Sequence, residues 1–144
     1  MLKPLRTQFI IADGSRARWV RRSDHADDFV TTRELKAEPR HGGHPQGVVF
    51  EGSSGQRFSV EESADAAHEH RDRFAREVAD AISAQAAEGA VERLVIVAPT
   101  RALSAINQHL NAAASAKLRK TLAKDLTKTP DHKLASWLHP LEFD

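Results

Sequence analysis

Short apolar runs separated by turn residues open the chain. Residues 7–12 (TQFIIA) form a β-branched and aromatic run, and the Asp13-Gly14 dipeptide after it accepts the positive dihedral angles of a tight hairpin turn. Residues 15–22 alternate between two faces as a return strand does, and residues 29–35 (FVTTREL) have the composition of a third strand. The pattern predicts a three-stranded antiparallel meander.

The middle of the chain changes from a glycine-rich stretch to helical periodicity. Residues 38–58 hold five of the seven glycines and two prolines and follow neither period, which predicts a long, flexible, exposed loop. Ser59 and Glu62 then have the spacing of a capping box. Because apolar residues recur at helical spacing from there until Gly89, the sequence predicts one long helix that begins at Ser59.

The second half alternates strands with helices. Residues 91–98 (VERLVIVA) are apolar at the centre, as in a strand buried on both faces, and the helix before them favours parallel pairing. Pro99-Thr100 begins a second helix that frays into the alanine-rich residues 111–116. Residues 118–126 favour a fifth strand, with continuation of the helix as the alternative, and Asp131 is placed to cap a final short helix.

The order of these elements predicts an α/β fold. Three antiparallel strands precede two strands that pair in parallel, so we expect a mixed five-stranded sheet flanked by helices. A chain of 144 residues without an internal repeat or a linker favours a single domain over residues 1–144.

Composition narrows the class of protein. Hydrophobic residues make up 40% of the chain and charged residues 28%, which is the usage of folded globular domains. The longest wholly apolar run, residues 94–98, is too short to span a membrane, and residues 1–12 lack the apolar core of a secretory signal. The absence of cysteine excludes disulfides and thiolate chemistry. These features favour a location in the reducing cytoplasm.

Charge is distributed unevenly, although the net charge is only +1. Residues 1–22 carry six Lys/Arg and one acid, residues 23–100 carry eight and fifteen, and residues 101–144 carry seven and four. Arg16 and Arg18 share one face of the predicted return strand and would supply phosphate contacts there. If the two basic segments meet in the fold, they form a surface suited to phosphate groups; scattered solvated charge is the alternative.

The predicted strand ends bring polar residues together. If the first, third, fourth and fifth strands point the same way, their carboxyl ends share one edge, where open α/β sheets bind ligands. The residues at these ends are Asp13, Thr100, Arg101, Thr127 and Lys128. Backbone N–H groups at helix starts favour an anion at such an edge. The alternatives are a turn former for Asp13, a solvated residue for Arg101 and a helix cap for Thr100.

Signals for a metal or a nucleophile are weak. His68 and His70 lie two residues apart, on opposite sides of a helix, so they cannot share a ligand sphere. His41 and His44 have a ligand-like spacing but no convincing third ligand. The sequence contains no P-loop and no nucleophile elbow. We therefore expect neither a metal nor a cofactor.

Four separated blocks of sequence occur in a distinctive order. They are IADGSRARWV (residues 11–20), HRDRFAREVADAI (70–82), LVIVAPTRAL (94–103) and KDLTKTP (124–130). Together they resemble the bacterial host attachment protein family, and the resemblance covers nearly the whole chain. That family is named for a proposed role in attachment of bacteria to host cells, so the resemblance implies a family without implying a chemistry.

The order of elements carries a second resemblance. A hairpin with Ala12-Asp13-Gly14, a third strand, a glycine-bearing loop, a long helix rich in Arg, Phe and Ala, and a buried strand resemble the middle domain of eukaryotic and archaeal peptide-chain release factors. The resemblance implies a ribonuclease H-like fold. In those factors a Gly-Gly-Gln loop helps to position water for hydrolysis of the peptidyl-tRNA ester. Here two residues separate Gly42-Gly43 from Gln46, and Gln56 follows a single glycine, so neither forms an intact Gly-Gly-Gln.

Three functions are consistent with the sequence. The first is a cytoplasmic binding module that contacts RNA or the ribosome, alone or with a protein partner. Its expected binding residues are Asp13, Arg16, Arg18, Gly42, Gly43, Gln46, Arg57, Thr100, Arg101, Lys124 and Thr127. The second is a hydrolase of an ester such as peptidyl-tRNA, in which Gln46 or Gln56 orients water; the altered Gly-Gly-Gln pattern disfavours it.

The third function is a factor that itself attaches the cell to its host, which the lack of a secretory signal disfavours. We expect Trp19 to pack in the core rather than to offer a stacking surface. The sequence leaves the oligomeric state open.

Overall fold

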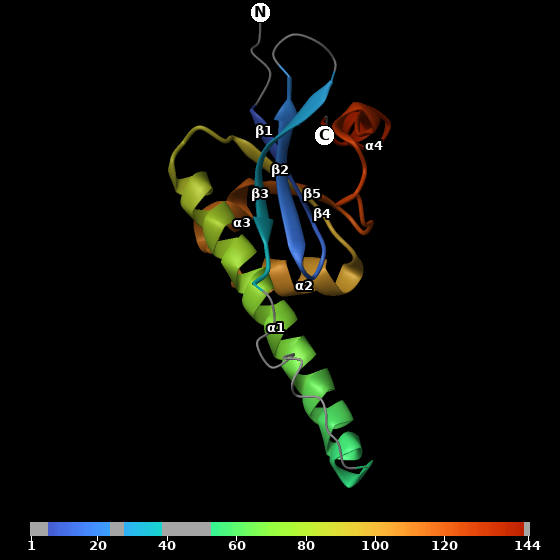
Figure 1. Ribbon diagram of the computed structural model, residues 1–144. Helices are drawn as coiled ribbons and strands as arrows, with labels where there is room; N and C mark the ends of the chain where they lie inside the picture. Colours follow the sequence, from blue (N-terminus) through green and yellow to red (C-terminus); the bar gives the residue numbers. More distant parts are fainter. Residues whose placement is uncertain (1–5, 24–27, 39–52, 143–144) are drawn as a thin grey trace, which may run out of the picture.

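The protein is built on one twisted five-stranded sheet (Figure 1). The computed structural model describes residues 6–23, 28–38 and 53–142. The strands are β1 (Thr7–Ala12), β2 (Arg16–Arg22), β3 (Phe29–Lys36), β4 (Arg93–Val97) and β5 (Leu118–Leu122). Their order across the sheet is β3-β2-β1-β4-β5. Because β2 runs antiparallel to β1 and β3 whereas β4 runs parallel to β1 and β5, the predicted mixed sheet is confirmed.

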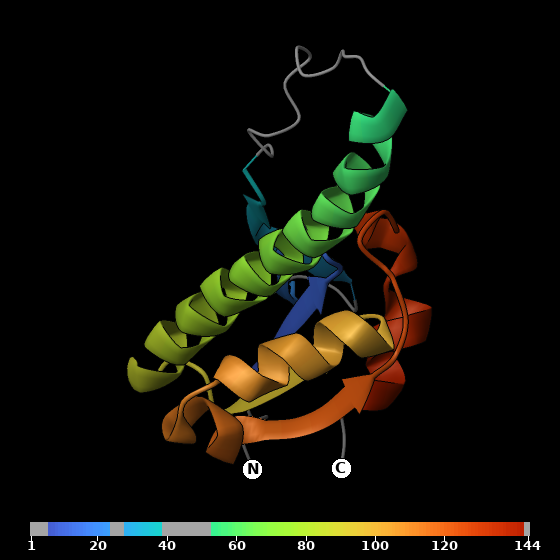
Figure 2. The ribbon, with the colours of Figure 1, turned by 90° about the horizontal axis from the view of Figure 1, so that it is seen from below.

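Helices cover both faces of this sheet. They are α1 (Ser53–Ala87), α2 (Thr100–His109), α3 (Ala112–Lys117) and, after β5, η3 (Asp131–Lys133), α4 (Ala135–Leu138) and η4 (His139–Leu141). The helices α1, α2 and α3 pack on one face, and the chain after β5 packs on the other (Figures 1 and 2). The N-terminal turns of α1 project beyond the sheet and beyond α2 (Figure 1).

Helix α1 begins earlier than the sequence predicted. The expected start was Ser59, but the helix begins at Ser53, so residues 53–58 are helical and Ser59 is an interior position rather than a cap. Once a helix is nucleated each added residue gains a hydrogen bond, and a single glycine, which costs about 1 kcal/mol relative to alanine, does not stop it. At the other end, Gly89 adopts a left-handed φ of 78°, as a helix stop requires. Residues 39–52 of the predicted loop lie outside the described residues.

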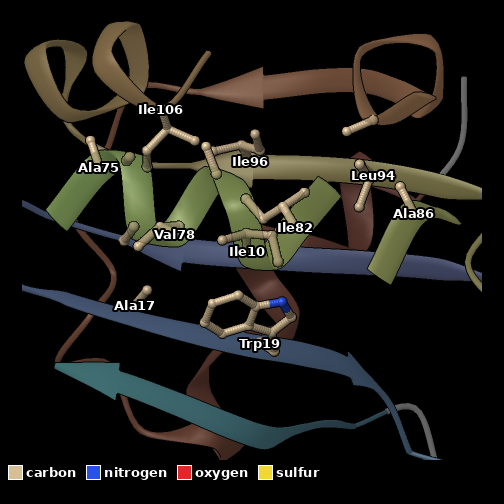
Figure 3. Packing of buried hydrophobic residues seen from close by; sticks show 14 of the residues in the cluster. Ile10, Ala17, Trp19, Ala75, Val78, Ile82, Ala86, Leu94, Ile96 and Ile106 are labelled. Carbon is tan, nitrogen blue, oxygen red and sulfur yellow. The ribbon is translucent and has the colours of Figure 1, made fainter. Parts of the chain in front are cut away.

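The face under α1 holds the larger core cluster (Figure 3). Phe74, Val78 and Ile82 recur every four residues, so they form one apolar stripe of α1 against the sheet. Trp19 reaches this stripe from β2 and is 1% exposed, which confirms its predicted place in the core. The guanidinium of Arg33 lies 4.9 Å from the centre of the Trp19 ring and covers its outer side.

The chain between β4 and β5 forms two helices rather than one that frays. Asn111 caps α3, because its side-chain oxygen accepts a hydrogen bond from the N–H of Ala114 at 2.9 Å. The backbone N–H of Asn111 in turn donates to the hydroxyl of Ser83 on α1 at 3.1 Å. The predicted fraying of residues 111–116 is therefore wrong: a polar cap starts a second helix there and ties it to α1.

The chain after β5 closes the opposite face of the sheet. Side chains that alternate with the first cluster point to this face, including Phe9 of β1 and Phe29 of β3, whose rings meet edge to face at 5.4 Å. Leu126, Leu134 and Leu138 come from the C-terminal segment and are at most 2% exposed. Both faces of the sheet are thus covered, although the two sides are covered by different parts of the chain.

Arg18 lies under this C-terminal layer, and its predicted place on an exposed basic face is wrong. Its side chain alternates as predicted, but the residue is only 7% exposed. Its guanidinium donates to the carbonyls of Leu126 at 2.9 Å and Thr129 at 2.6 Å. It also donates to the hydroxyl of Thr31 and to the carboxylate of Asp131. Arg18 therefore anchors the C-terminal segment to β2 and is not placed to bind a phosphate.

Asp131 was expected to cap the final helix, but its side chain points to the sheet instead. The carboxylate accepts hydrogen bonds from the backbone N–H and the hydroxyl of Thr31 and from Arg18. Partial burial acts to raise the pKa of Asp131, but the bonds from Thr31, together with the bond and charge of Arg18, outweigh it. The pKa of Asp131 consequently lies below its ordinary value.

This lowered pKa predicts how acid affects stability. A carboxyl whose pKa is lower in the folded state stabilises the fold above the pKa of the unfolded chain and loses that contribution as the pH falls through the folded pKa. We expect the difference in unfolding free energy between the wild type and Asp131→Asn to be largest above about pH 4 and to shrink as the pH falls further. Urea unfolding of both proteins across pH 2–7 measures this difference; a gap that widened in acid would contradict the assignment.

Candidate functional site

Four strands end at one edge of the sheet, as the sequence predicted. Strands β1, β3, β4 and β5 point the same way, since β1 is parallel to β4 and β4 to β5, and β2 runs opposite to both of its neighbours. Their carboxyl ends are Ala12, Lys36, Val97 and Leu122. We call this the carboxyl edge. The helix α2 follows β4 directly and so begins at the same edge.

Asp13 organises the turn at the carboxyl edge. Its Oδ1 accepts hydrogen bonds from the backbone N–H of Ser15 at 2.8 Å and of Arg16 at 2.7 Å, so the carboxylate is a turn former. Gly14 does not adopt the left-handed φ expected for it; among the described glycines only Gly89 does. A Cβ added at Gly14 would lie 3.0 Å from Cδ of Arg71, so the turn closely approaches the side chain of Arg71 on α1.

Thr127 joins this turn to the segment that follows β5. Its Oγ1 lies 3.2 Å from Oδ2 of Asp13 and 2.6 Å from Oδ1 of Asp125. Because a hydroxyl carries a single hydrogen, Thr127 donates to one of these carboxylates at a time. The structure therefore brings the predicted residues Asp13 and Thr127 together, with Asp125 beside them.

A cavity of about 150 Å³ opens where the turn, α1 and α2 meet. Among its lining residues are the predicted Asp13 and Arg101, and also Arg71, His68 and Asp72 of α1. Asp72 has partners of its own, because its carboxylate lies 3.4 Å from Nε2 of His109 and 3.9 Å from Arg76. A ligand in this cavity would therefore meet the two arginines Arg71 and Arg101 beside two carboxylates that are already hydrogen-bonded within the protein.

The start of α2 adds positive electrostatic potential beside these two arginines. Its N-cap is Pro99, which makes no side-chain cap bond, and the first turn contains no acidic residue. The predicted role of Thr100 as a cap is therefore not found, and Thr100 is the exposed first residue of α2. Arg101 follows it, exposed, on the rim of the cavity. A helix start of this kind carries partial positive charge.

The other predicted residues divide into two groups. Gly42, Gly43 and Gln46 lie outside the described residues. Gln56 and Arg57 belong to α1, so their predicted place in a loop is wrong.

Lys124 and Arg16 keep the exposed positions expected of them. Lys124 follows the end of β5 by two residues, and Arg16 is paired in register with Lys36 of β3. Both therefore lie at the carboxyl edge.

Two residues of interest escaped the sequence analysis. Arg71 lies on the exposed side of an amphipathic helix, where a charged residue is ordinary. Only its closeness to the turn at Gly14, which the sequence does not show, distinguishes it from the other exposed arginines of α1. Trp137 lies on α4 with Lys124 against its ring. A tryptophan in a short C-terminal helix is equally compatible with a core position, so periodicity could not single it out.

The described part of the chain shows neither a metal site nor a membrane-spanning helix. Across residues 6–23, 28–38 and 66–142, no three side chains of His, Cys, Asp or Glu are arranged to hold a metal ion. No helix within those ranges combines the length and the apolar character needed to cross a bilayer.

Fold and site together define a small α/β domain whose polar residues gather at the carboxyl edge of one mixed sheet. The sequence matches the family described as "Protein required for attachment to host cells" over residues 9–138, and the chain belongs to this family. The resemblance to the host attachment family is thus confirmed. A search of curated proteins gave no match.

Among solved structures, the chain is similar to one described as an archaeal protein, with a TM-score of 0.49 and 14% sequence identity. The similarity covers 94% of this chain and 36% of the archaeal one, so this chain spans well under half of that protein's length. The resemblance to the release-factor middle domain and to the ribonuclease H-like fold stays a prediction.

Proposed function

We propose that the protein is a cytoplasmic RNA-binding module, acting on or away from the ribosome, whose carboxyl edge contacts the phosphate backbone. One observation carries the proposal: Arg71 and Arg101, which are distant in sequence, line the same small cavity beside the uncapped start of α2. Guanidinium groups and helix N–H groups are the usual partners of phosphate oxygens.

The size of the cavity supports contact with the backbone rather than with a base. Sites for drug-sized ligands measure roughly 300–1,000 Å³, whereas this cavity measures about 150 Å³. A single phosphate group suits that volume better than a whole nucleotide. Contacts of this kind position a nucleic acid without reading its sequence.

The distribution of charge along the carboxyl edge supports the same partner. Exposed Arg16 and Lys36 are cross-strand partners there, and exposed Lys124 follows β5. The nearby carboxylates of Asp13 and Asp125 are engaged by Thr127 and by backbone N–H groups. These hydrogen bonds orient the two carboxylates without removing their charge, so the exposed cations of this edge supply its attraction for a polyanion.

The alternative functions have less support. The hydrolase hypothesis needs a glutamine on a glycine loop; Gln56 lies in α1, and Gln46 lies outside the described residues. The family's description names a requirement for attachment; under our proposal that requirement is indirect, and it arises from an RNA-bound protein inside the cell. Cell fractionation tests the location, because recovery only outside the cytoplasm would contradict it.

The phosphate contact predicts a salt-dependent affinity that depends on two arginines. In a filter-binding series between 50 and 200 mM salt, we expect Arg71→Gln and Arg101→Gln each to lower RNA affinity several-fold. Each should also reduce the slope of log affinity against log salt by about 0.7 for a single strand, because one phosphate contact is lost.

The matched control is Arg73→Gln, which makes the same charge change two residues further along α1. Two residues turn a helix by about 200°, so Arg73 faces away from the cavity. The control should retain the wild-type slope. Absence of RNA binding at 50 mM salt would contradict the proposed function, and equal losses for Arg73→Gln and Arg71→Gln would contradict the site.

A further inference from the structure

Trp137 is a large apolar side chain that neither core cluster absorbs. It is 38% exposed, and no other large hydrophobic side chain is comparably exposed among residues 6–23, 28–38 and 66–142. Its neighbours Leu134 and Leu138 point into the second core cluster and are fully buried. The N-cap Leu134 and the last residue of α4, Leu138, are therefore buried, whereas the indole lies at the surface. A partly exposed indole leaves one aromatic surface available to a flat partner.

A cation already lies against the ring. The ammonium of Lys124 is 4.3 Å from the centre of the Trp137 ring, close enough for a cation–π contact. Lys124 follows the end of β5 by two residues, so this pair borders the carboxyl edge. Lysine carries its charge on a flexible four-carbon stem, and its ammonium can leave the ring for a nearby anion without backbone movement.

The charge around the pair selects an anionic partner. Lys128 and Lys133 are exposed in the same C-terminal segment. Among the described acids of that segment, Asp131 is paired with Arg18 and Glu142 with Arg22, and Asp125 accepts a hydrogen bond from Thr127. A flat aromatic face among exposed lysines matches a chain that alternates phosphates with flat bases.

We propose that Trp137 and Lys124 form a stacking site for one base of single-stranded RNA, with Lys124 turning from the ring to the adjacent phosphate. This inference rests on the proposed function and adds the class of RNA, because the bases of a duplex are already stacked inside it and are not available to an indole. The site is separate from the cavity: the cavity residues hold backbone phosphates, whereas Trp137 holds a base.

The two tryptophans of the chain allow a direct test. Trp19 is 1% exposed and Trp137 is 38% exposed, so a stacked base quenches Trp137 and leaves the emission of Trp19 unchanged. We would titrate the full-length protein with a dye-labelled oligoadenylate single strand and with a duplex RNA of the same length. Dye anisotropy measures binding, and intrinsic fluorescence measures contact with the indole.

We expect single-stranded RNA to quench the wild type and to bind it more tightly than the duplex. Trp137→Ala should weaken single-strand binding by roughly tenfold, within the range that one stacked base contributes, and should leave duplex binding unchanged. Trp137→Phe keeps an aromatic ring at this position and controls for a folding defect in the alanine variant. It should retain most of the affinity, but the fluorescence quenching should disappear because the indole is gone. Lys124→Gln should weaken binding, whereas the matched control Arg119→Gln, at the exposed second position of β5, should not.

The outcomes separate this inference from the proposed function. RNA binding without quenching of Trp137, or with single-strand affinity within twofold of the wild type in Trp137→Ala, overturns the stacking site and leaves the RNA-binding module intact. Equal affinity for single strand and duplex also overturns it. If no RNA binds and an acidic peptide quenches Trp137 instead, the proposed function and the stacking site are both overturned.

Discussion

Replacing Arg18 with leucine is expected to lower the free energy of unfolding by about 2–4 kcal/mol, because the carbonyls of Leu126 and Thr129 and the half-exposed carboxylate of Asp131 lose their donor. The guanidinium of Arg18 serves the carbonyls of Leu126 and Thr129 and the carboxylate of Asp131 at the same time. Leucine fills much of the volume but donates no hydrogen bond. Each buried acceptor that loses its donor costs about 1–3 kcal/mol. Unfolding by guanidinium chloride, followed by circular dichroism, measures the change in unfolding free energy.

Arg16→Leu is the matched control for this prediction. Arg16 belongs to the same strand and alternates onto the same side as Arg18, but it is exposed. We expect a change within about 0.5 kcal/mol, as for ordinary surface substitutions. Equal effects of the two substitutions would show that Arg18 does not anchor the C-terminal segment.

Replacing Leu134 with alanine is the second change with a large expected effect. Leu134 is fully buried against Phe9, Phe29 and the other residues of the second core cluster. Truncating a buried leucine removes transfer free energy and leaves a cavity, which together cost about 2–5 kcal/mol. The denaturant concentration at the unfolding midpoint should fall. The dependence of the unfolding free energy on denaturant concentration should stay constant, because the surface area exposed on unfolding does not change.

The neighbouring exposed residue supplies the control for the leucine substitution. Lys133→Ala changes the same turn but removes no buried area, so it should leave the unfolding midpoint nearly unchanged. A Leu134→Ala protein as stable as Lys133→Ala would mean that the C-terminal layer contributes little to the fold. In that case the sheet would stay folded even if its face under the C-terminal segment were exposed to solvent.

These two substitutions test one structural layer by different means. Arg18 fastens the C-terminal segment through polar contacts, and Leu134 fastens it through apolar burial. The same segment carries Thr127 to Asp13 at the carboxyl edge and places Trp137 beside Lys124. The stability of this layer and the geometry of both proposed RNA contacts are therefore linked. The variants of Arg71, Arg101 and Trp137 should be compared with wild type only after their unfolding midpoints have been measured.

Strand direction explains why part of the candidate site could be predicted. Strand composition and turn residues indicated the meander, and a helix before β4 required a parallel pairing. Those rules place Asp13, Arg101 and Thr127 at one edge without any knowledge of side-chain contacts. The contact between Thr127 and Asp13, at 3.2 Å, agrees with that placement.

The errors have a common origin in contacts between distant segments. Arg18 alternated onto the side that was expected, but periodicity does not tell whether another segment covers that side. Asp131 resembled a helix cap because a local role was the only one that its neighbours could suggest, whereas its partners Thr31 and Arg18 are about a hundred residues away. The start of α1 was misplaced because a glycine and a capping pattern are weak signals against helix propagation.

The sequence by itself determined the elements of this protein, their directions and the edge at which its polar residues collect, since these follow from local periodicity and from the handedness of short connections. Only the tertiary structure decided which of the charged residues face solvent. It buried Arg18, brought Arg71 to the turn at Gly14, and left Trp137 outside both cores. The physical reason is that exposure depends on the segments that pack over a residue, and those segments lie far from it along the chain.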